Sequence, residues 1–420
     1  MSGSGSRFSQ TVRSRYHNGV QRTPDKTSQT TATAVANLVY GMIASLAGTI
    51  VPQLSTRLGL TPEQIGSVFL AQAAGMIIAS VSAGPLVDHR GKKTGVCLAL
   101  VVIVAALLAL PASHSGGVIL LAMVLLGLGN GTLVTSLNAI ASDIDPKKRA
   151  TILAFVKCFY GLGGFATPFL GASLLKGNTI TLCYVIVALT LATLALMSWI
   201  AIPPPSVTRG FRLAEVRAVA SRPILYLFSL TVFLYVSCEV GTFNWMAKHL
   251  IAQGMPEASA LRVVALGFSV GLIVGRLAFA GMLLRIRAIT ATLVGAAGMA
   301  VTTYAILQVH GVLETGILAF LAALSMAPIF PATLAMTGDN FPRMTASAMG
   351  VVITSGWLGL AVSSRLIGAI AGADPRNIRT GLLVLPVFSV LMVIVNLVIR
   401  RMMASSLRVL PAMVSGSRTI

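Results

Sequence analysis

Four ionisable residues of this chain lie inside long apolar runs, where a charge is rare. They are Lys157, Glu239, Arg276 and Arg365. A charged side chain is costly in such surroundings, so it usually faces a cavity or a partner of opposite charge. Glu239 is the only acid well inside a run. It is therefore a candidate for coupling to an ion or binding a solute, and a structural ion pair is the alternative.

The depth of each charge within its run predicts its partner. Counting along antiparallel runs puts Glu239 and Arg365 on the same side of the centre, so Arg365 is the first candidate partner and Lys157 the second. Arg276 lies near the end of its run, where we expect its long side chain to reach the membrane surface. An unpaired Glu239 would suit a proton carrier, whereas a pair with Arg365 would suit a gate.

Uncharged polar and aromatic residues gather in several of the apolar runs, including runs without a charged residue at depth. Amides, hydroxyls and aromatic rings together suit a polar organic solute such as a sugar. For each single residue the alternative is a hydrogen bond between helices, worth about 1 kcal/mol or less. The candidate substrate-binding residues are Tyr40, Gln72, Asn130, Asn138, Tyr160, Tyr235, Glu239, Asn244, Trp245 and Trp357.

The composition excludes an ordinary soluble enzyme. Of 420 residues, 55% are apolar and only 10% are charged, whereas soluble chains carry about a quarter charged residues. No phosphate-binding loop, zinc motif or nucleophile–base arrangement is present. The four cysteines lie in apolar stretches without CxxC spacing, which is typical of packing residues. We therefore expect a membrane protein that is not an enzyme and has neither cofactor nor metal site.

Twelve apolar runs are long enough to cross a membrane, since a helical span needs about 20 mostly apolar residues. An all-α membrane protein with twelve transmembrane helices is therefore expected. The spans are expected at 34–54, 62–87, 94–111, 117–140, 150–175, 179–202, 223–250, 259–283, 289–309, 313–336, 345–371 and 377–399.

The runs divide six and six around a polar midpoint. Asp143-Ile-Asp-Pro146 after the fourth run is echoed by Asp339-Asn-Phe-Pro342 after the tenth, which indicates a duplication of six spans. The predicted organisation is a disordered cytosolic tail (1–33), a first half (34–202), a cytosolic linker (203–222), a second half (223–399) and a cytosolic tail (400–420).

The basic residues predict the orientation. Of 31 Lys and Arg residues, 22 fall in segments on the side of the termini and only 5 in segments on the opposite side. Basic residues concentrate on the cytoplasmic side of membrane proteins, so both termini are expected there, in the cell (inner) membrane. The net charge of +20 is thereby explained without nucleic acid. The expected partners are the lipid bilayer and a small-molecule substrate, and the chain is expected to be a monomer.

The loop between the second and third runs carries a recognisable motif, Gly84-Pro-Leu86-Val-Asp88-His-Arg90-Gly91-Lys92-Lys93. Its glycines allow a tight turn, and Asp88 can pair with a helix N-terminus or an arginine at the membrane edge. The loop resembles the major facilitator superfamily pattern G-x-L-x-D-r-x-G-r-k. The resemblance implies a secondary transporter with rocker-switch alternating access. The candidate coupling or gating residues are Asp88, Arg90, Lys92, Lys157, Glu239 and Arg365.

The seventh run, from Tyr235 through Glu239 to Trp245, resembles the corresponding span of the fucose/glucose-type symporters. The resemblance implies symport of a sugar-like solute with a coupling ion, a proton or sodium. The coupling acids of that group fall on Gly48 and Val134 here, which puts ordinary proton symport in doubt. An exporter of amphiphilic drugs, metabolites or metal chelates is the first alternative, and a non-transporting membrane receptor on the same fold is the second.

Overall fold

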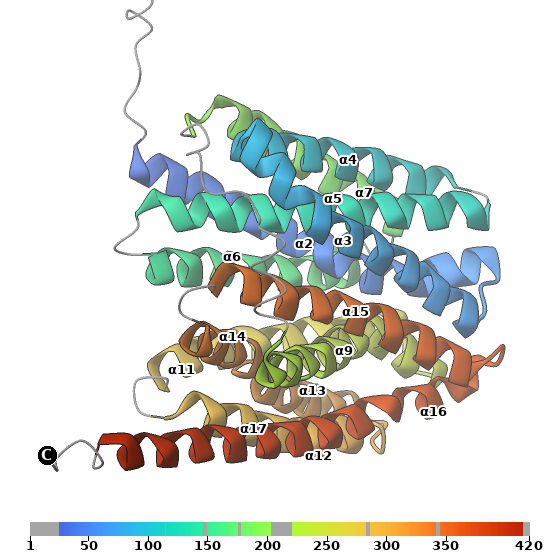
Figure 1. Cartoon of the computed structure of the whole chain (residues 1–420). Helices are drawn as coiled ribbons and strands as arrows, with labels where there is room; N and C mark the ends of the chain where they lie inside the picture. The colour runs from blue at the N-terminus through green and yellow to red at the C-terminus, as the bar shows by residue number, and fades with distance from the viewer. Residues whose placement is uncertain are drawn as a thin grey trace, which may run out of the picture.

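The computed structural model describes residues 25–113, 115–145, 149–174, 178–202, 221–282, 286–341 and 345–414. The elements of these residues are helices joined by short connections (Figure 1). The first half consists of α2 (Lys26–Leu58), α3 (Pro62–Arg90), α4 (Lys92–Ala112), α5 (Gly116–Ile144), α6 (Arg149–Phe169) with its π-helical continuation η2 (Leu170–Leu174), and α7 (Thr179–Trp199).

The second half repeats this plan with more interruptions. It consists of α9 (Pro223–Ala252), a rod of α10 (Glu257–Arg262), η3 (Val263–Ser269) and α11 (Val270–Met282), then α12 (Ala288–Ile306), α13 (Val312–Met326) with α14 (Ile329–Asn340), α15 (Thr345–Ala371), η4 (Pro375–Asn377), α16 (Ile378–Leu382) and α17 (Val384–Val414). Proline explains one interruption, because Pro328 has no amide proton to continue the helix between α13 and α14.

The predicted all-α membrane fold of two six-helix halves is confirmed. Ten helical segments of the described residues are long and apolar enough to cross a membrane. With α3 and α6, which pack in the same bundle, they account for all twelve predicted spans. Large apolar side chains remain exposed on the outside, for example Val294, Val301 and Val387, as expected for a surface that faces lipid.

Two helices extend beyond the predicted spans. α2 begins at Lys26, so the predicted disordered tail 1–33 is wrong for residues 26–33. Asp25 accepts hydrogen bonds from the backbone N–H groups of Thr27 and Ser28, which caps the helix early. A hydrogen bond from the Ser28 hydroxyl holds the pKa of the Asp25 carboxyl below its ordinary value. At the other end, α17 continues to Val414 inside the predicted tail 400–420. Residues 1–24, most of the linker (203–220) and 415–420 lie outside the described residues.

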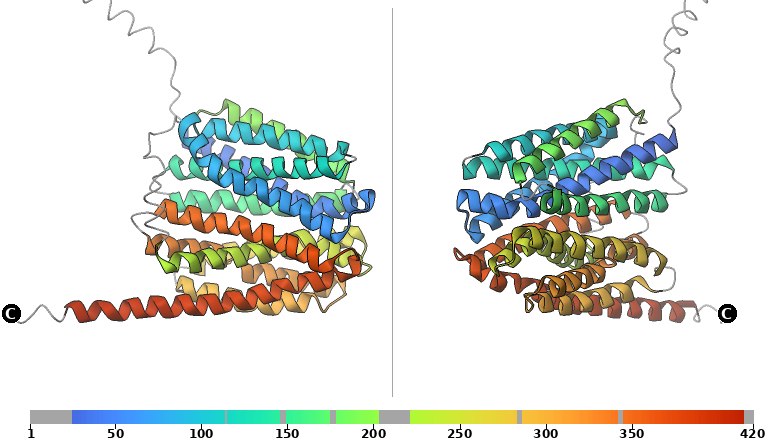
Figure 2. Two further views of the ribbon diagram at one scale, coloured as in Figure 1. Left: turned by 45° about the vertical axis from the view of Figure 1, so that its right-hand side comes forward. Right: turned by 180° about the vertical axis from the view of Figure 1, so that it is seen from behind.

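The two halves lie side by side, with their helices roughly parallel (Figures 1 and 2). We call the end of the bundle that holds Lys26 and Val414 the termini end, and the opposite end the α2–α3 end. Across the interface α3 packs along α15, α2 along α9, and α6 along η3. The α3–α15 contact is close because glycines face each other: a Cβ on Gly368 would lie 2.7 Å from the Pro62 carbonyl oxygen and 3.1 Å from the Gly66 Cα.

Candidate functional site

An ion pair joins the middle of α9 to α11 inside the bundle. Glu239 of α9 accepts a hydrogen bond from Arg276 of α11, with 3.1 Å between Oε1 and Nη2. The two side chains are 17% and 27% exposed, so they face a space that solvent can enter. Both residues belong to the second half, and the pair therefore does not bridge the two halves.

This pair corrects two predictions. The expected partners of Glu239 were Arg365 and then Lys157, and Arg276 was expected to reach the membrane surface. Because α11 continues to Met282, Arg276 lies about 9 Å from the end of its helix. At that depth the guanidinium charge is compensated by the Glu239 carboxylate on the neighbouring helix rather than by water at the membrane surface, and the side chain turns towards the carboxylate.

Lys157 of α6 faces this pair from the first half. Its Nζ lies 5.8 Å from the ring centroid of Tyr40 and 5.7 Å from that of Tyr160. The two rings contact each other, with their centroids 4.9 Å apart. The Arg276 guanidinium lies 5.8 Å from the Tyr160 ring, which joins the two halves at this point. Lys157 therefore stands in an aromatic cage rather than in an ion pair with a described residue.

Tyr235 completes the group from α9. Its side chain is buried beside Glu239 and Arg276, and its ring lies 6.0 Å from Phe330. We call the whole set the central cluster: Tyr40, Lys157, Tyr160, Tyr235, Glu239 and Arg276. The six residues come from four helices. All of them except Arg276 were candidate site residues. Two cations, one acid and three phenol groups can together bind a polar solute through hydrogen bonds and charge.

The other candidate substrate residues lie in helix-packing surroundings. Trp245 packs edge-to-face on Phe69, with 5.7 Å between ring centroids. Asn244 and Gln72 are buried, and Trp357 is half-buried against the apolar core. Asn130 is fully buried, and neither atom of its amide has a hydrogen-bond partner among the described residues; the same holds for the Asn138 side-chain oxygen. A binding role for these six residues stays a prediction.

Gly48, where the fucose/glucose-type symporters carry an acid, lies at the crossing of α2 and α9. A Cβ at this position would lie 2.9 Å from the Phe243 carbonyl oxygen and 3.1 Å from the Asn244 Cα. The crossing therefore leaves no room for an aspartate. Close helix packing occupies the place of that coupling group.

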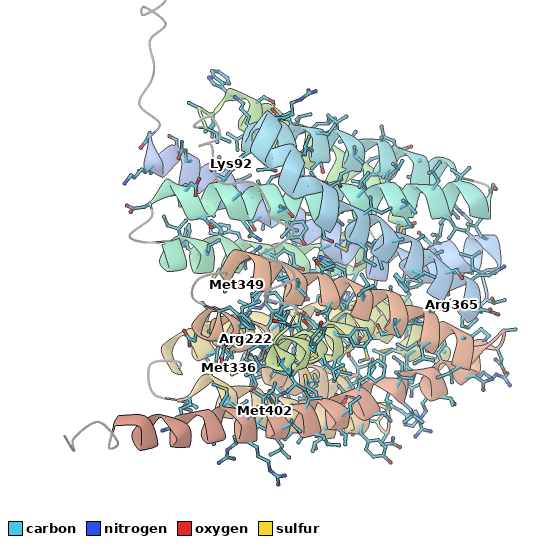
Figure 3. The ribbon with its side chains drawn as sticks, in the orientation of Figure 1. Lys92, Arg222, Met336, Met349, Arg365 and Met402 are labelled. Atoms are coloured by element: carbon cyan, nitrogen blue, oxygen red, sulfur yellow. The ribbon has the colours of Figure 1, made fainter. Side chains whose placement is uncertain are left out.

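Arg365 is not part of the central cluster and lies at the α2–α3 end (Figure 3). Its Nη2 donates to the Glu63 carboxylate at 2.9 Å, which links α15 to α3 and so joins the two halves. Nearby, Lys248 of α9 donates to the Ser55 hydroxyl of α2 at 2.5 Å. Glu63 is not recognisable as a partner from the sequence, because an acid in the first turn of a helix is explained by the helix dipole alone.

The motif loop lies at the termini end. Lys92, labelled in Figure 3, pairs with the Asp143 carboxylate of α5, within the first half. Lys93 donates to the Ile200 carbonyl oxygen at 3.0 Å. Arg90 is exposed, and the side chain of Asp88 lies outside the described residues. The gating roles of Asp88, Arg90 and Lys92 stay predictions.

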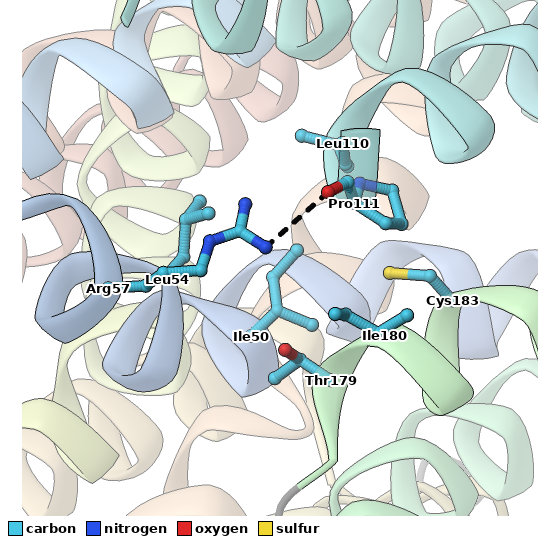
Figure 4. Close-up of a pocket in the computed structure, with 8 residues that line it drawn as sticks. All are labelled: Ile50, Leu54, Arg57, Leu110, Pro111, Thr179, Ile180 and Cys183. Carbon is cyan, nitrogen blue, oxygen red and sulfur yellow. Dashed lines mark hydrogen bonds between the residues drawn. The ribbon is translucent and has the colours of Figure 1, made fainter. Parts of the chain in front are cut away.

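A small pocket at the α2–α3 end is a different kind of site (Figure 4). It lies within the first half, between α2, α4 and α7, and its lining is mostly apolar. Among the described residues that line it, Arg57 is the charged one, and it donates to the Pro111 carbonyl oxygen at 3.4 Å. The arginine is therefore used to hold α2 against the end of α4, and the central cluster remains the candidate site.

Two curated relatives match over most of their length. Bypass of stop codon protein 6 of Saccharomyces cerevisiae is 22% identical over 399 residues, covering 85% of this chain and 79% of the relative. The 3-(3-hydroxy-phenyl)propionate transporter of Escherichia coli K12 is 23% identical over 376 residues, covering 83% of this chain and 90% of the relative.

Solved transporter structures share the fold. The nucleoside transporter NupG superposes with a TM-score of 0.74 at 12% identity, covering 89% of this chain and 99% of that structure. The E. coli fucose:proton symporter FucP superposes with a TM-score of 0.64 at 17% identity, covering 87% and 97%. At such identities the likeness concerns the fold alone.

The family model described as "Major Facilitator Superfamily" matches residues 33–364, which include the motif loop and the central cluster. The match confirms the family assigned from the motif. The chain is therefore a member of the Major Facilitator Superfamily, a multi-pass membrane transporter and not an enzyme.

Proposed function

We propose that the protein is a secondary active transporter that moves a small polar organic solute across the membrane by alternating access. The central cluster carries this proposal. Its ionisable and phenolic side chains come from both halves, and a rocking movement of the halves would expose a solute bound between them first to one side and then to the other. Charged groups inside a membrane protein are costly and are kept where a substrate or ion needs them.

The candidate solute is sugar-like, because the phenol, guanidinium and carboxylate groups of the central cluster together offer donors and acceptors for hydroxyls. A proton or sodium ion is the proposed coupling ion, with Glu239 as the acid that couples its movement to the solute. We further propose a monomer in the cell (inner) membrane with both termini in the cytoplasm, which follows from the bias of basic residues.

Counterflow in proteoliposomes tests this function without knowledge of direction or coupling. Vesicles containing the purified full-length chain would be preloaded with one unlabelled solute class at a time: sugars, hydroxylated organic acids or amphiphilic drugs. We expect a polar solute to drive uptake of its labelled form, and protein-free vesicles to show none. Counterflow with the amphiphilic drugs alone would favour the exporter. Absence of counterflow for every class would contradict transport and favour a receptor.

A further inference from the structure

The charges of the central cluster do not balance. The cluster contains three charged side chains, Lys157, Glu239 and Arg276. Glu239 and Arg276 neutralise each other through their 3.1 Å contact. Lys157 makes no ion pair with a described residue, so the cluster keeps one positive charge.

The aromatic cage around Lys157 compensates only part of the cost of this charge. The ammonium lies at almost equal distances above two tyrosine rings, 5.8 and 5.7 Å from their centroids. A cation–π contact stabilises an ammonium far less than the hydration that it loses inside a membrane protein. The side chain is partly exposed, so an incoming ligand can reach it. An anion beside the ammonium would supply the rest of the compensation.

On the basis of the transport function proposed above, we infer that the substrate is a small organic acid carried as its monoanion, with its carboxylate bound by Lys157. One negative charge cancels the excess charge of the cluster. A carboxylate also accepts hydrogen bonds, which the Lys157 ammonium and the neighbouring tyrosine hydroxyls can donate. The inference replaces a neutral sugar by an acid, which includes sugar acids and hydroxylated aromatic acids.

The Glu239–Arg276 pair sharpens this selectivity. A neutral solute would leave Lys157 uncompensated, and a cationic solute would add a second like charge beside it. A dianion would meet the Glu239 carboxylate, whose charge Arg276 already balances. Such unpaired or repelled charges discriminate strongly between ligands of the same size.

Matched acid and neutral compounds test the inference. The full-length protein in proteoliposomes would be assayed for counterflow with 3-hydroxybenzoate against 3-hydroxybenzyl alcohol, and with glucuronate against glucose. We expect exchange of at least one acid and little exchange of its neutral counterpart. Lys157→Met should raise the half-saturating concentration of that acid by about tenfold or more, as expected for the loss of a charge-assisted contact.

Two variants control for charge and folding. Lys157→Arg keeps the positive charge and should retain most of the acid exchange. Arg262→Gln removes an exposed positive charge of α10 and should leave exchange unchanged. Equal exchange of acid and neutral partners, or an unchanged half-saturating concentration in Lys157→Met, would overturn the inference and leave the transport function standing.

Thermal unfolding with and without ligand separates failure of the anion site from failure of the transport function. If no compound exchanges, the transport function fails. An acid that raises the unfolding temperature of the protein but not that of Lys157→Met would still support the anion site. If no acid of the panel raises the unfolding temperature and none exchanges, the inference fails as well.

Discussion

Glu239 and Arg276 form their ion pair within one half of the molecule, so the pair can move as a unit when the halves rock. Lys157 and Tyr160 approach the pair from the other half. The Arg276 guanidinium lies 5.8 Å from the centroid of the Tyr160 ring. Opening at the cluster would separate Lys157 from the pair. The acid would then be exposed to a different electrostatic environment in each state, which is what a coupling group requires.

Replacing Glu239 by glutamine tests the coupling role. The substitution keeps an acceptor for Arg276 and removes the group that can carry a proton. We expect accumulation driven by an imposed pH gradient to be lost, while counterflow, which needs no net proton movement, is kept. Both are measured as uptake of labelled solute into proteoliposomes. Glu314→Gln, an exposed acid in the first turn of α13, is the matched control. Unchanged accumulation would exclude Glu239 from coupling.

At the scale of elements, the α3–α15 interface closes the α2–α3 end through packing more than through charge. Glu63 and Arg365 are 52% and 41% exposed, and exposed ion pairs contribute only about 0–1 kcal/mol. Beneath them, Gly66 and Gly368 let the two helix backbones approach, and the Glu63 amide donates to the Gly372 carbonyl oxygen at 3.2 Å. The helices can meet here because neither glycine carries a side chain.

Gly368→Ala should disturb this interface far more than Glu63→Gln. The added methyl would lie 2.7 Å from the Pro62 carbonyl oxygen, an overpacking that typically costs about 1–3 kcal/mol. We expect a lower unfolding temperature in detergent and slower counterflow, because each cycle must close this end. Gly350→Ala, on the same helix but facing open space, should leave both unchanged. Equal effects of Gly368→Ala and Gly350→Ala would contradict the packing argument.

At the scale of the whole molecule, the sequence predicted the fold because apolar length alone determines a membrane span. The predicted span 94–111 corresponds to α4, Lys92–Ala112, and the predicted span 179–202 corresponds to α7, Thr179–Trp199. The ion pairs were harder to predict, since a sequence gives the depth of Glu239 but not the direction in which its side chain points. Counting along the runs favoured Arg365 and Lys157 and assigned Arg276 to the membrane surface, and only the packing of the helices shows that Arg276 is the partner.

The orientation of the whole bundle in the membrane is a testable consequence of its charge distribution. Most basic residues belong to sequence segments on the side of the termini, and we propose that the termini end is cytoplasmic. Single cysteines introduced at Asp374, in the α15–η4 connection, and at Arg287, before α12, probe opposite ends. We expect a membrane-impermeant thiol reagent to label Asp374→Cys in intact cells and Arg287→Cys only after permeabilisation, above the background of the four native cysteines. The reverse pattern would invert the topology, and with it the side of the membrane on which the Glu63–Arg365 contact closes the transporter.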